Sequence, residues 1–255
     1  MSRNFELLQN LGKDQLVVDT VIPAQPELEP EVVAEPLGVI EPQLKLEPVE
    51  HEQLTKLVQR VFLLPGAESP HTVVFSATES GNGASWICAR AAETLAAQVS
   101  SNVFLVDANL RKPGLHEQFG MDNLEGFTDA LRGRASMREF ARQLSRPNLW
   151  LVTAGSSAEA SEAAPGSPRV RQKLAELRSP GDYVLIDAPA INVANDAAAL
   201  GANADGLIVV LRANASRREP ARKMVQELNA AKVKILGAVL NQRTFPIPDS
   251  IYHRL

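Results

Sequence analysis

From residue 52 to residue 241, short runs of consecutive apolar residues alternate with segments of helical periodicity. The apolar runs predict strands over 72–76, 102–107, 149–153, 183–187, 206–212 and 235–241. The other segments predict helices over 52–63, 84–99, 123–132, 137–144, 169–177, 195–201 and 219–230. Strands that are apolar on successive residues are covered on both faces, and strands separated by helices run parallel. The pattern therefore predicts a doubly wound α/β fold with a mostly parallel sheet.

The first 50 residues have a different character. Residues 19–54 hold six prolines and nine acidic residues against one lysine, Lys45. Proline removes backbone donors and like charges repel, so this stretch is expected to stay extended and solvated. Before it, Phe5, Leu8 and Leu11 recur at a spacing that predicts a short helix over 2–15. We expect this helix within 1–18, either as a docking segment or without a role, then a disordered linker over 19–50 and one folded domain over 51–255.

The composition excludes several classes of protein. A single cysteine, Cys88, rules out an internal disulfide framework and a multi-cysteine zinc site, and we expect it to face the core. The formal net charge of −4 gives no general electrostatic footprint for nucleic acid. No apolar run approaches the roughly 18–20 residues of a membrane span, and the start lacks the apolar core of a signal peptide. We therefore expect a cytoplasmic protein that does not bind nucleic acid.

Ligands of such sheets bind at the carboxyl ends of the strands, where loops lead into helices. The first of these loops, residues 78–85, reads T-E-S-G-N-G-A-S. Two glycines let the backbone turn its N–H groups around phosphate, and the following helix adds positive potential. By spacing this is the P-loop frame G-x-x-x-x-G-K-S/T, with Gly83 as the second glycine, Ser85 as the magnesium-binding hydroxyl and Ala84 at the lysine position. The alternative interpretation is a turn that only packs the strand tightly on the helix.

Two further strand ends carry an acid. Asp107 closes the predicted strand 102–107, and Asp187 closes the strand 183–187. A carboxylate at the end of a buried strand is costly unless it meets a metal ion, a water or a donor. Four apolar residues followed by Asp187 resemble the second acidic strand of P-loop NTPases, whose carboxylate helps to hold Mg²⁺. Two such acids beside a glycine-rich loop favour a nucleotide site over two structural aspartates.

Over residues 52–241 the chain resembles the cytoplasmic kinase domain of the bacterial tyrosine kinases that regulate capsule and exopolysaccharide synthesis. These kinases belong to the deviant P-loop group that includes the Min and Par partitioning ATPases. Residues 77–85 align without a gap with the family's S-A-x-P-G-E-G-K-S. The family's second motif reads V-D-x-D-x-R-x-P, followed by a leucine and a phenylalanine-glycine pair. Residues 106–120 match it with VDANLRKPGLHEQFG, although Asn109 replaces the second acid. NLEGFTDALRG over 123–133 and LGAVLN over 236–241 follow two more family motifs.

The resemblance implies a P-loop NTPase fold and a phosphotransferase that binds ATP or ADP with Mg²⁺. It implies catalytic roles for Asp107 and Asp187, and coordination of Mg²⁺ by Ser85 together with these two acids. It further implies that the nucleotide is bound by Ser80, Gly81, Asn82, Gly83, Ala84, Ser85, Trp86, Arg111 and, near the base, Asn241.

The sequence departs from the family at residues that carry its activity. The lysine replaced by Ala84 makes a contact worth on the order of 3–4 kcal/mol of transition-state stabilisation. Glu79 stands where the partitioning ATPases carry an additional lysine. Tyr252 is the one tyrosine near the C-terminus, where the kinases carry a tyrosine cluster. Thr55 and Val58 replace the arginines of the E-x-x-R-x-x-R pattern used in ring assembly, which argues against ring formation.

We therefore predict a weak or inactive kinase that regulates exopolysaccharide or capsule biosynthesis or export. Two alternatives stay open. One is an active ATP-dependent tyrosine kinase in which Arg111 or Lys112 supplies the missing cation, and the other is a Min/Par-like positioning ATPase. The expected partner is a membrane polysaccharide co-polymerase, a chain-length regulator or another export component, which would recruit the protein to the inner face of the cell membrane. Homo-oligomerisation is left open.

Overall fold

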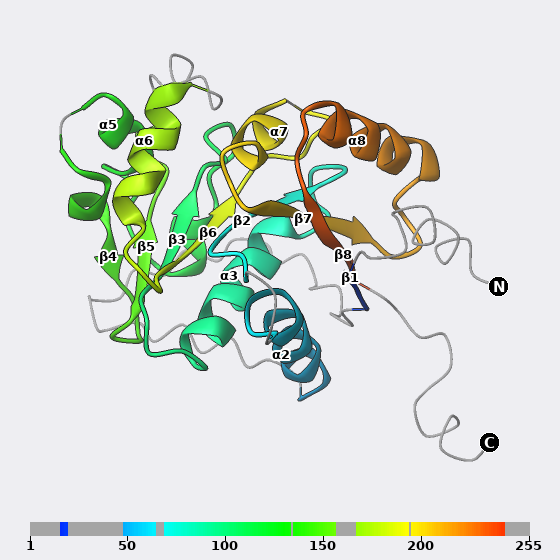
Figure 1. The fold of residues 1–255 in the computed structure, drawn as a ribbon, viewed down its shortest axis with the longest axis horizontal. Helices are drawn as coiled ribbons and strands as arrows, with labels where there is room; N and C mark the ends of the chain where they lie inside the picture. The colour runs from blue at the N-terminus through cyan, green and yellow to red at the C-terminus, as the bar shows by residue number, and fades with distance from the viewer. Residues whose placement is uncertain are drawn as a thin grey trace, which may run out of the picture.

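The computed structural model describes residues 16–19, 48–64, 69–133, 135–156, 167–193 and 195–242. Within this part the chain forms an eight-stranded sheet in the order β1-β8-β7-β2-β6-β3-β5-β4. Neighbouring strands run parallel, apart from β4, which is antiparallel to β5. Helices cover both faces of the sheet (Figure 1). The predicted doubly wound α/β fold is confirmed.

The six predicted strands form with ends within one residue of the prediction. They are β2 (Thr72–Ala77), β3 (Val103–Asp107), β5 (Leu149–Val152), β6 (Tyr183–Asp187), β7 (Gly206–Arg212) and β8 (Ile235–Asn241). Successive side chains of these strands enter different cores, because a strand alternates its side chains between the two faces of a sheet. Val73 and Phe75 belong to one hydrophobic cluster, whereas Val74 belongs to the other. This is why the strands are apolar on consecutive residues.

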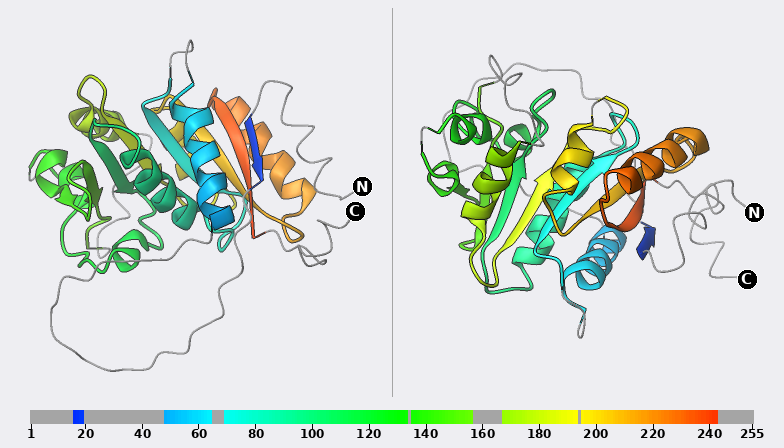
Figure 2. Two further views of the ribbon diagram at one scale, coloured as in Figure 1. Left: turned by 90° about the horizontal axis from the view of Figure 1, so that it is seen from below. Right: turned by 45° about the horizontal axis from the view of Figure 1, so that its top comes forward.

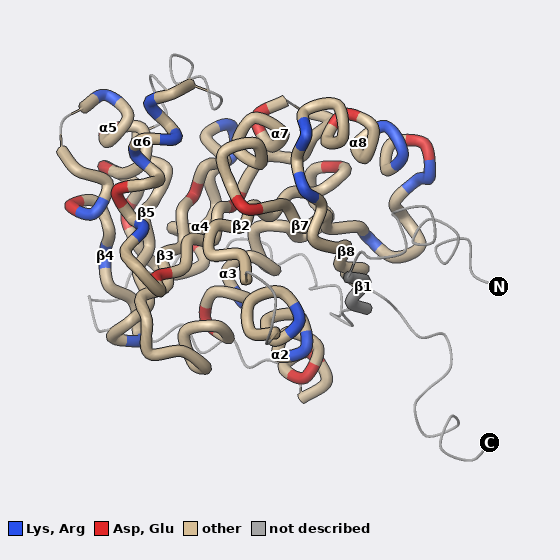
Figure 3. The backbone as a smooth tube through the Cα atoms, viewed as in Figure 1, with Lys and Arg blue, Asp and Glu red and all other residues tan. Residues whose placement is uncertain are grey.

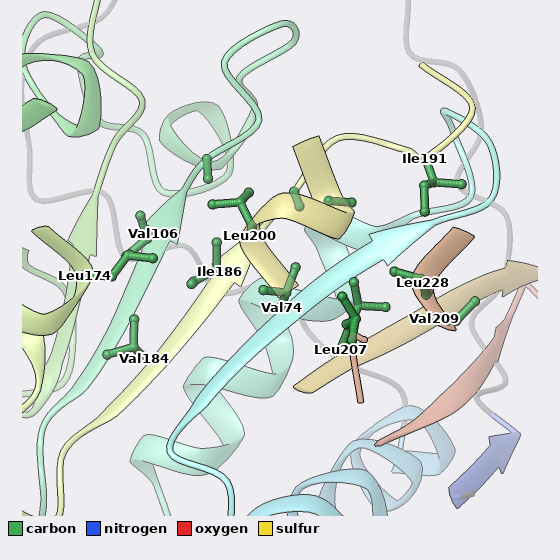
Figure 4. Packing of buried hydrophobic residues seen from close by; sticks show 14 of the residues in the cluster. Val74, Val106, Leu174, Val184, Ile186, Ile191, Leu200, Leu207, Val209 and Leu228 are labelled. Atoms are coloured by element: carbon green, nitrogen blue, oxygen red, sulfur yellow. The ribbon is translucent and has the colours of Figure 1, made fainter. Parts of the chain in front are cut away.

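The two cores lie on opposite faces of the sheet (Figure 2). One contains residues of α2 (Pro48–Phe62), α3 (Ala84–Ala96) and the short α4 (Leu115–Gln118). The other contains residues of α5 (Phe127–Leu131), α6 (Pro168–Leu177), α7 (Asp196–Gly201) and α8 (Arg218–Ala230). Figure 4 shows Val74, Ile186 and Val209 of the sheet in this second cluster, together with Leu200 of α7 and Leu228 of α8.

The long outer helices are amphipathic. On α2, Leu54 and Leu57 are buried, whereas Lys56 pairs with Glu52 at 2.6 Å on the exposed side. Basic and acidic stretches alternate along α8, whereas on α2 the acidic residues precede the basic ones (Figure 3). An apolar stripe opposite a charged face is what a helix that covers one side of a sheet requires. In the described part of the chain, no helix combines the length and the apolar character that a bilayer span needs.

The predicted helix over 137–144 is wrong in its second half. A single 3-10 turn, η1 (Met137–Phe140), is followed by the two-residue strand β4 (Arg142–Gln143). A capping box stabilises the start of this turn: Ser136 is the N-cap, and its N–H donates to Glu139 Oε1 at 2.9 Å. Beyond it the free edge of β5 offers backbone partners that compete with helix continuation. The predicted helix over 123–132 shortens to α5.

The start of the chain contributes a strand that the sequence pattern did not indicate. β1 (Leu16–Asp19) lies parallel to β8, with Leu16 opposite Gly237 and Asp19 opposite Leu240. A run of four residues is too short to show a period, so tertiary pairing decides its conformation. α2 begins at Pro48, four residues before the predicted start. The predicted helix over 2–15 and the linker between β1 and α2 lie outside the described residues, and the domain boundaries remain predictions.

Candidate functional site

Three features predicted from the sequence meet at the carboxyl edge of the sheet. The loop of residues 78–83 follows β2, Asp187 ends β6 and Asp107 ends β3. In the strand order β6 lies between β2 and β3, and Asp107 is the register partner of Asp187. The strand order therefore places a glycine-rich loop beside two adjacent carboxylates.

The glycine-rich loop depends on two backbone conformations that favour glycine. Gly81 has φ 87° and Gly83 has φ 86°, both in the left-handed region. At Gly81 an added Cβ would meet nothing within 4 Å, whereas at Gly83 it would collide with the side-chain amide of Asn241. Gly83 is also the N-cap of α3, and its carbonyl accepts from the N–H of Ile87 at 3.0 Å. The second glycine of the loop is therefore fixed by conformation and by space.

Buried side-chain amides hold the loop in place. Asn82 Nδ2 donates to Thr78 Oγ1 at 2.9 Å and to Ser216 Oγ at 3.3 Å. Asn241 Nδ2 donates to the Asn82 carbonyl at 2.9 Å, and Asn241 Oδ1 accepts from the N–H of Gln242 at 2.8 Å. Both ends of the Asn241 amide are thus engaged within the protein, and its contact with a base stays a prediction. These bonds connect the loop to the turn after β7 and to the end of β8.

Asp107 organises the segment that follows β3. It is fully buried and accepts from the backbone N–H groups of Asn109, Gly114 and Leu115, each at 3.1 Å. Burial raises the pKa of Asp107 to about 6, although the three N–H groups and the charge of His116 oppose that shift. Its carboxylate therefore fixes the turn that leads into α4.

Asp187 has no such partners. It is fully buried, and neither carboxyl oxygen makes a hydrogen bond within the described part of the chain. Burial and the charge of Asp107 raise its pKa well above the usual range, and the nearby hydroxyl of Ser85 opposes the shift. A buried carboxylate without a donor is costly, and a hard cation or its water ligands would satisfy it. The chemistry of Ser85 and Asp187 thus fits Mg²⁺.

A cavity of about 400 Å³ opens beside the loop. Most residues predicted to bind nucleotide line it from the loop and the first turn of α3, namely Ser80, Gly81, Asn82, Gly83, Ala84, Ser85 and Trp86. Its opposite wall includes Asn109, Lys112, Gly114 and Glu117. Arg111 is not part of this lining: its Nε pairs with Asp196 Oδ2 at 3.2 Å, at the start of α7. Its contact with nucleotide stays a prediction.

Sequence reasoning missed the second wall of the cavity and the bracing of the loop. Glu117 and Gln118 line the cavity because α4 folds back towards α3, and the short α4 was not predicted. Ser216 was not singled out, although its Oγ contacts Asn82 across 134 positions of sequence. No local pattern reports such a contact. Cys88 is buried as predicted, and burial raises the pKa of its thiol.

No family model matches the chain. Tyrosine-protein kinase YwqD of Bacillus subtilis is 31% identical over 170 residues, which are 67% of this chain and 71% of YwqD. The chain belongs to the bacterial tyrosine-protein kinase family. A longer relative, the succinoglycan biosynthesis transport protein ExoP of Rhizobium meliloti, is 29% identical over 183 residues, and the match spans 23% of ExoP.

Solved structures support the fold. The kinase domain of the Escherichia coli tyrosine kinase ETK superposes with a TM-score of 0.75 over 95% of this chain and 96% of that domain, at 20% identity. A ParA family ATPase from Chlorobium tepidum superposes with a TM-score of 0.55 over 67% of this chain and 73% of the ATPase, also at 20% identity. At these identities the likeness establishes the P-loop NTPase fold.

Proposed function

We propose that this protein is a regulatory member of the bacterial tyrosine kinase family that is weak or inactive in phosphoryl transfer. The observation that carries this proposal is Ala84, which lines the cavity at the start of α3 where the P-loop lysine of the family stands. The charged side chains that line the cavity within the described residues are Glu79, Glu117 and Lys112. Two carboxylates against one ammonium are unfavourable for a triphosphate.

The expected loss follows from the chemistry of phosphoryl transfer. Positioning and charge stabilisation supply most of the catalysis, and a preorganised cation on the phosphates is central to both. Removing one such contact costs on the order of 3–4 kcal/mol, which is about a hundredfold to a thousandfold in rate. The methyl group of Ala84 cannot replace it, and Glu79 adds a repulsive charge at the cavity wall.

Except for that lysine, the site retains the groups that would bind a magnesium nucleotide. Backbone N–H groups at the start of α3 would face phosphate, and the Ser85 hydroxyl with Asp187 would hold Mg²⁺. Mg²⁺ supplies neutralisation of phosphate charge when it is bound. Asp107 keeps the segment after β3 in place through its three backbone bonds. Nucleotide binding can therefore persist where transfer is slow, which suits a sensor.

The process and the partner are proposed from the relatives. ExoP is named for the biosynthesis and transport of an exopolysaccharide, succinoglycan. We extend this to the present chain as regulation of exopolysaccharide or capsule biosynthesis or export, with a membrane component of that system as the partner. Co-purification with the polysaccharide polymerisation and export proteins of the source organism tests the partner, and polysaccharide yield in a deletion strain tests the process. Unchanged yield and chain length in that strain would count against this part.

The biochemical part is tested by calorimetry. ATP and ADP are titrated into the wild type and into Ala84→Lys, each in the presence and in the absence of Mg²⁺. We expect the wild type to bind both nucleotides more weakly than Ala84→Lys and to require Mg²⁺, because the metal neutralises phosphate charge that would otherwise face Glu79 and Glu117. Equal affinities of the two chains would show that the lysine position is unimportant here and would overturn the reasoning.

A further inference from the structure

We propose that Lys112 supplies the cationic contact to the terminal phosphate of a bound nucleoside triphosphate that Ala84 cannot make. The inference rests on the proposed nucleotide site and assigns one residue of this chain to it. Among the described residues that line the cavity, Lys112 is the one cation. Its ammonium has no ion-pair partner within the described part of the chain, so it is available to a ligand.

The backbone turn after β3 directs the adjacent side chains of Arg111 and Lys112 to different places. The N–H of Lys112 donates to the carbonyl of Asn109 at 3.2 Å and to Asn109 Oδ1 at 3.3 Å, which closes a tight turn. Asp107 anchors both sides of this turn through Asn109 and Gly114. As a result Arg111 reaches Asp196 at 3.2 Å, whereas Lys112 lines the cavity. The geometry thus distinguishes two residues that the sequence left as equal candidates.

The strand order indicates which phosphate Lys112 meets. Along the carboxyl edge the strands follow in the order β8, β7, β2, β6 and β3. The glycine-rich loop lies at β2, the predicted base contact Asn241 ends β8, and Lys112 follows β3 on the other side of the loop. A nucleotide with its base towards β8 therefore extends its phosphate chain towards Asp187 and Lys112. The last phosphate comes nearest to Lys112, so the lysine should distinguish a triphosphate from a diphosphate.

The expected contribution of Lys112 to nucleotide affinity is smaller than that of a P-loop lysine. Lys112 lies on an exposed turn and carries a flexible stem, which loses rotamer freedom when the ammonium is held. A hydrogen bond that involves a charged group still contributes enough for a change in affinity of roughly tenfold or more. We therefore expect Lys112→Ala to weaken binding of a non-hydrolysable ATP analogue about tenfold, and ADP binding less than twofold.

The test measures dissociation constants of the analogue and of ADP, each with Mg²⁺, by calorimetry. The variants are Lys112→Ala, Lys112→Arg and Arg111→Ala, and Lys56→Ala on α2 is the control with the same change of charge. We expect selective loss of the analogue in Lys112→Ala, partial retention in Lys112→Arg and no change in Lys56→Ala. In an Ala84→Lys background the same Lys112→Ala change should cost less, because the restored lysine takes over the contact.

Three results would overturn the inference. The first is an equal loss of ATP analogue and ADP in Lys112→Ala, and the second is a loss that appears in Arg111→Ala instead. The third is a wild type that binds neither nucleotide, which would remove Lys112 from nucleotide chemistry yet leave the proposed regulatory role to its own tests of partner and polysaccharide. Melting curves identify any variant that fails to fold. If Lys112→Ala fails to fold, the ratio of analogue to ADP affinity in Lys112→Arg tests the inference in its place.

Discussion

Replacing Asp187 by asparagine tests whether the site is built around a cation that the protein does not itself provide. Both carboxyl oxygens of Asp187 are buried without a hydrogen-bond partner in the described residues. Asparagine has nearly the same shape and carries no charge, so the desolvation cost of the folded, ligand-free chain falls by about 1–3 kcal/mol at neutral pH. For a domain of 150–250 residues each kcal/mol corresponds to about 2–4 °C, so the melting temperature should rise by about 2–12 °C.

The raised pKa of Asp187 also fixes the direction in which the stability of the folded chain changes with pH. Because the pKa of Asp187 is raised on folding, the folded chain holds this proton more tightly than the unfolded chain does. Its contribution to stability is therefore greatest at low pH and is lost as the pH rises from the ordinary carboxyl range towards the raised pKa. Asp107, with a pKa of about 6, adds to the same loss between about pH 4 and pH 6. Asp187→Asn should flatten this fall in a series of thermal melts.

Asp107→Asn is the matched control. One oxygen of Asp107 accepts from Asn109 and the other from Gly114 and Leu115, so an amide group would place N–H against N–H. This variant should be destabilised, whereas Asp187→Asn should be stabilised and should lose the further gain that Mg-nucleotide gives the wild type. If Asp187→Asn melts as low as Asp107→Asn without ligand, Asp187 has a structural donor and the reasoning about a cation site is refuted.

Two further predictions concern the scaffold of the site. Gly83→Ala should destabilise the chain by about 2 kcal/mol or more in chemical unfolding, because it adds a collision with Asn241 to the cost of a left-handed φ. Gly81→Ala adds the conformational cost alone, about 1–2 kcal/mol. Equal losses of stability in the two variants would contradict the contact between residue 83 and Asn241. Removal of residues 1–19 should leave the edge of β8 without its partner strand, and hydrogen exchange should then show lower protection of the β8 amides. The exposed edge should also promote self-association, which light scattering detects. Unchanged protection would show that β1 does not stabilise the edge.

The sequence predicted most of what local physics decides. Apolar runs located six strands to within a residue, and the ends of two of them placed Asp107 and Asp187 side by side. Pairing across the sheet decided what sequence could not. β1 and β4 form because the edges of β8 and β5 offer backbone partners, and neither four nor two residues carry a period.

The same division holds inside the site. Gly83, Ala84 and Ser85 line one cavity together because a P-loop frame is contiguous in sequence, and their contacts with nucleotide stay predictions. The bond from Asn241 to Asn82 spans 159 positions, and the different directions of Arg111 and Lys112 depend on a turn held by Asp107. Such contacts arise only from the assembled sheet, so a motif could indicate the candidates without choosing between them.

The most direct test of the central claim is the rate of ATP turnover by the wild type and by Ala84→Lys at saturating Mg-ATP. Ala84 lines the cavity and stands at the lysine position of the family's motif, so restoring that lysine should raise the rate about a hundredfold or more. Asp187→Asn in the Ala84→Lys background should abolish the gain, which ties it to this site. A wild-type rate equal to that of Ala84→Lys would contradict the account of a kinase-family protein that has lost phosphoryl transfer.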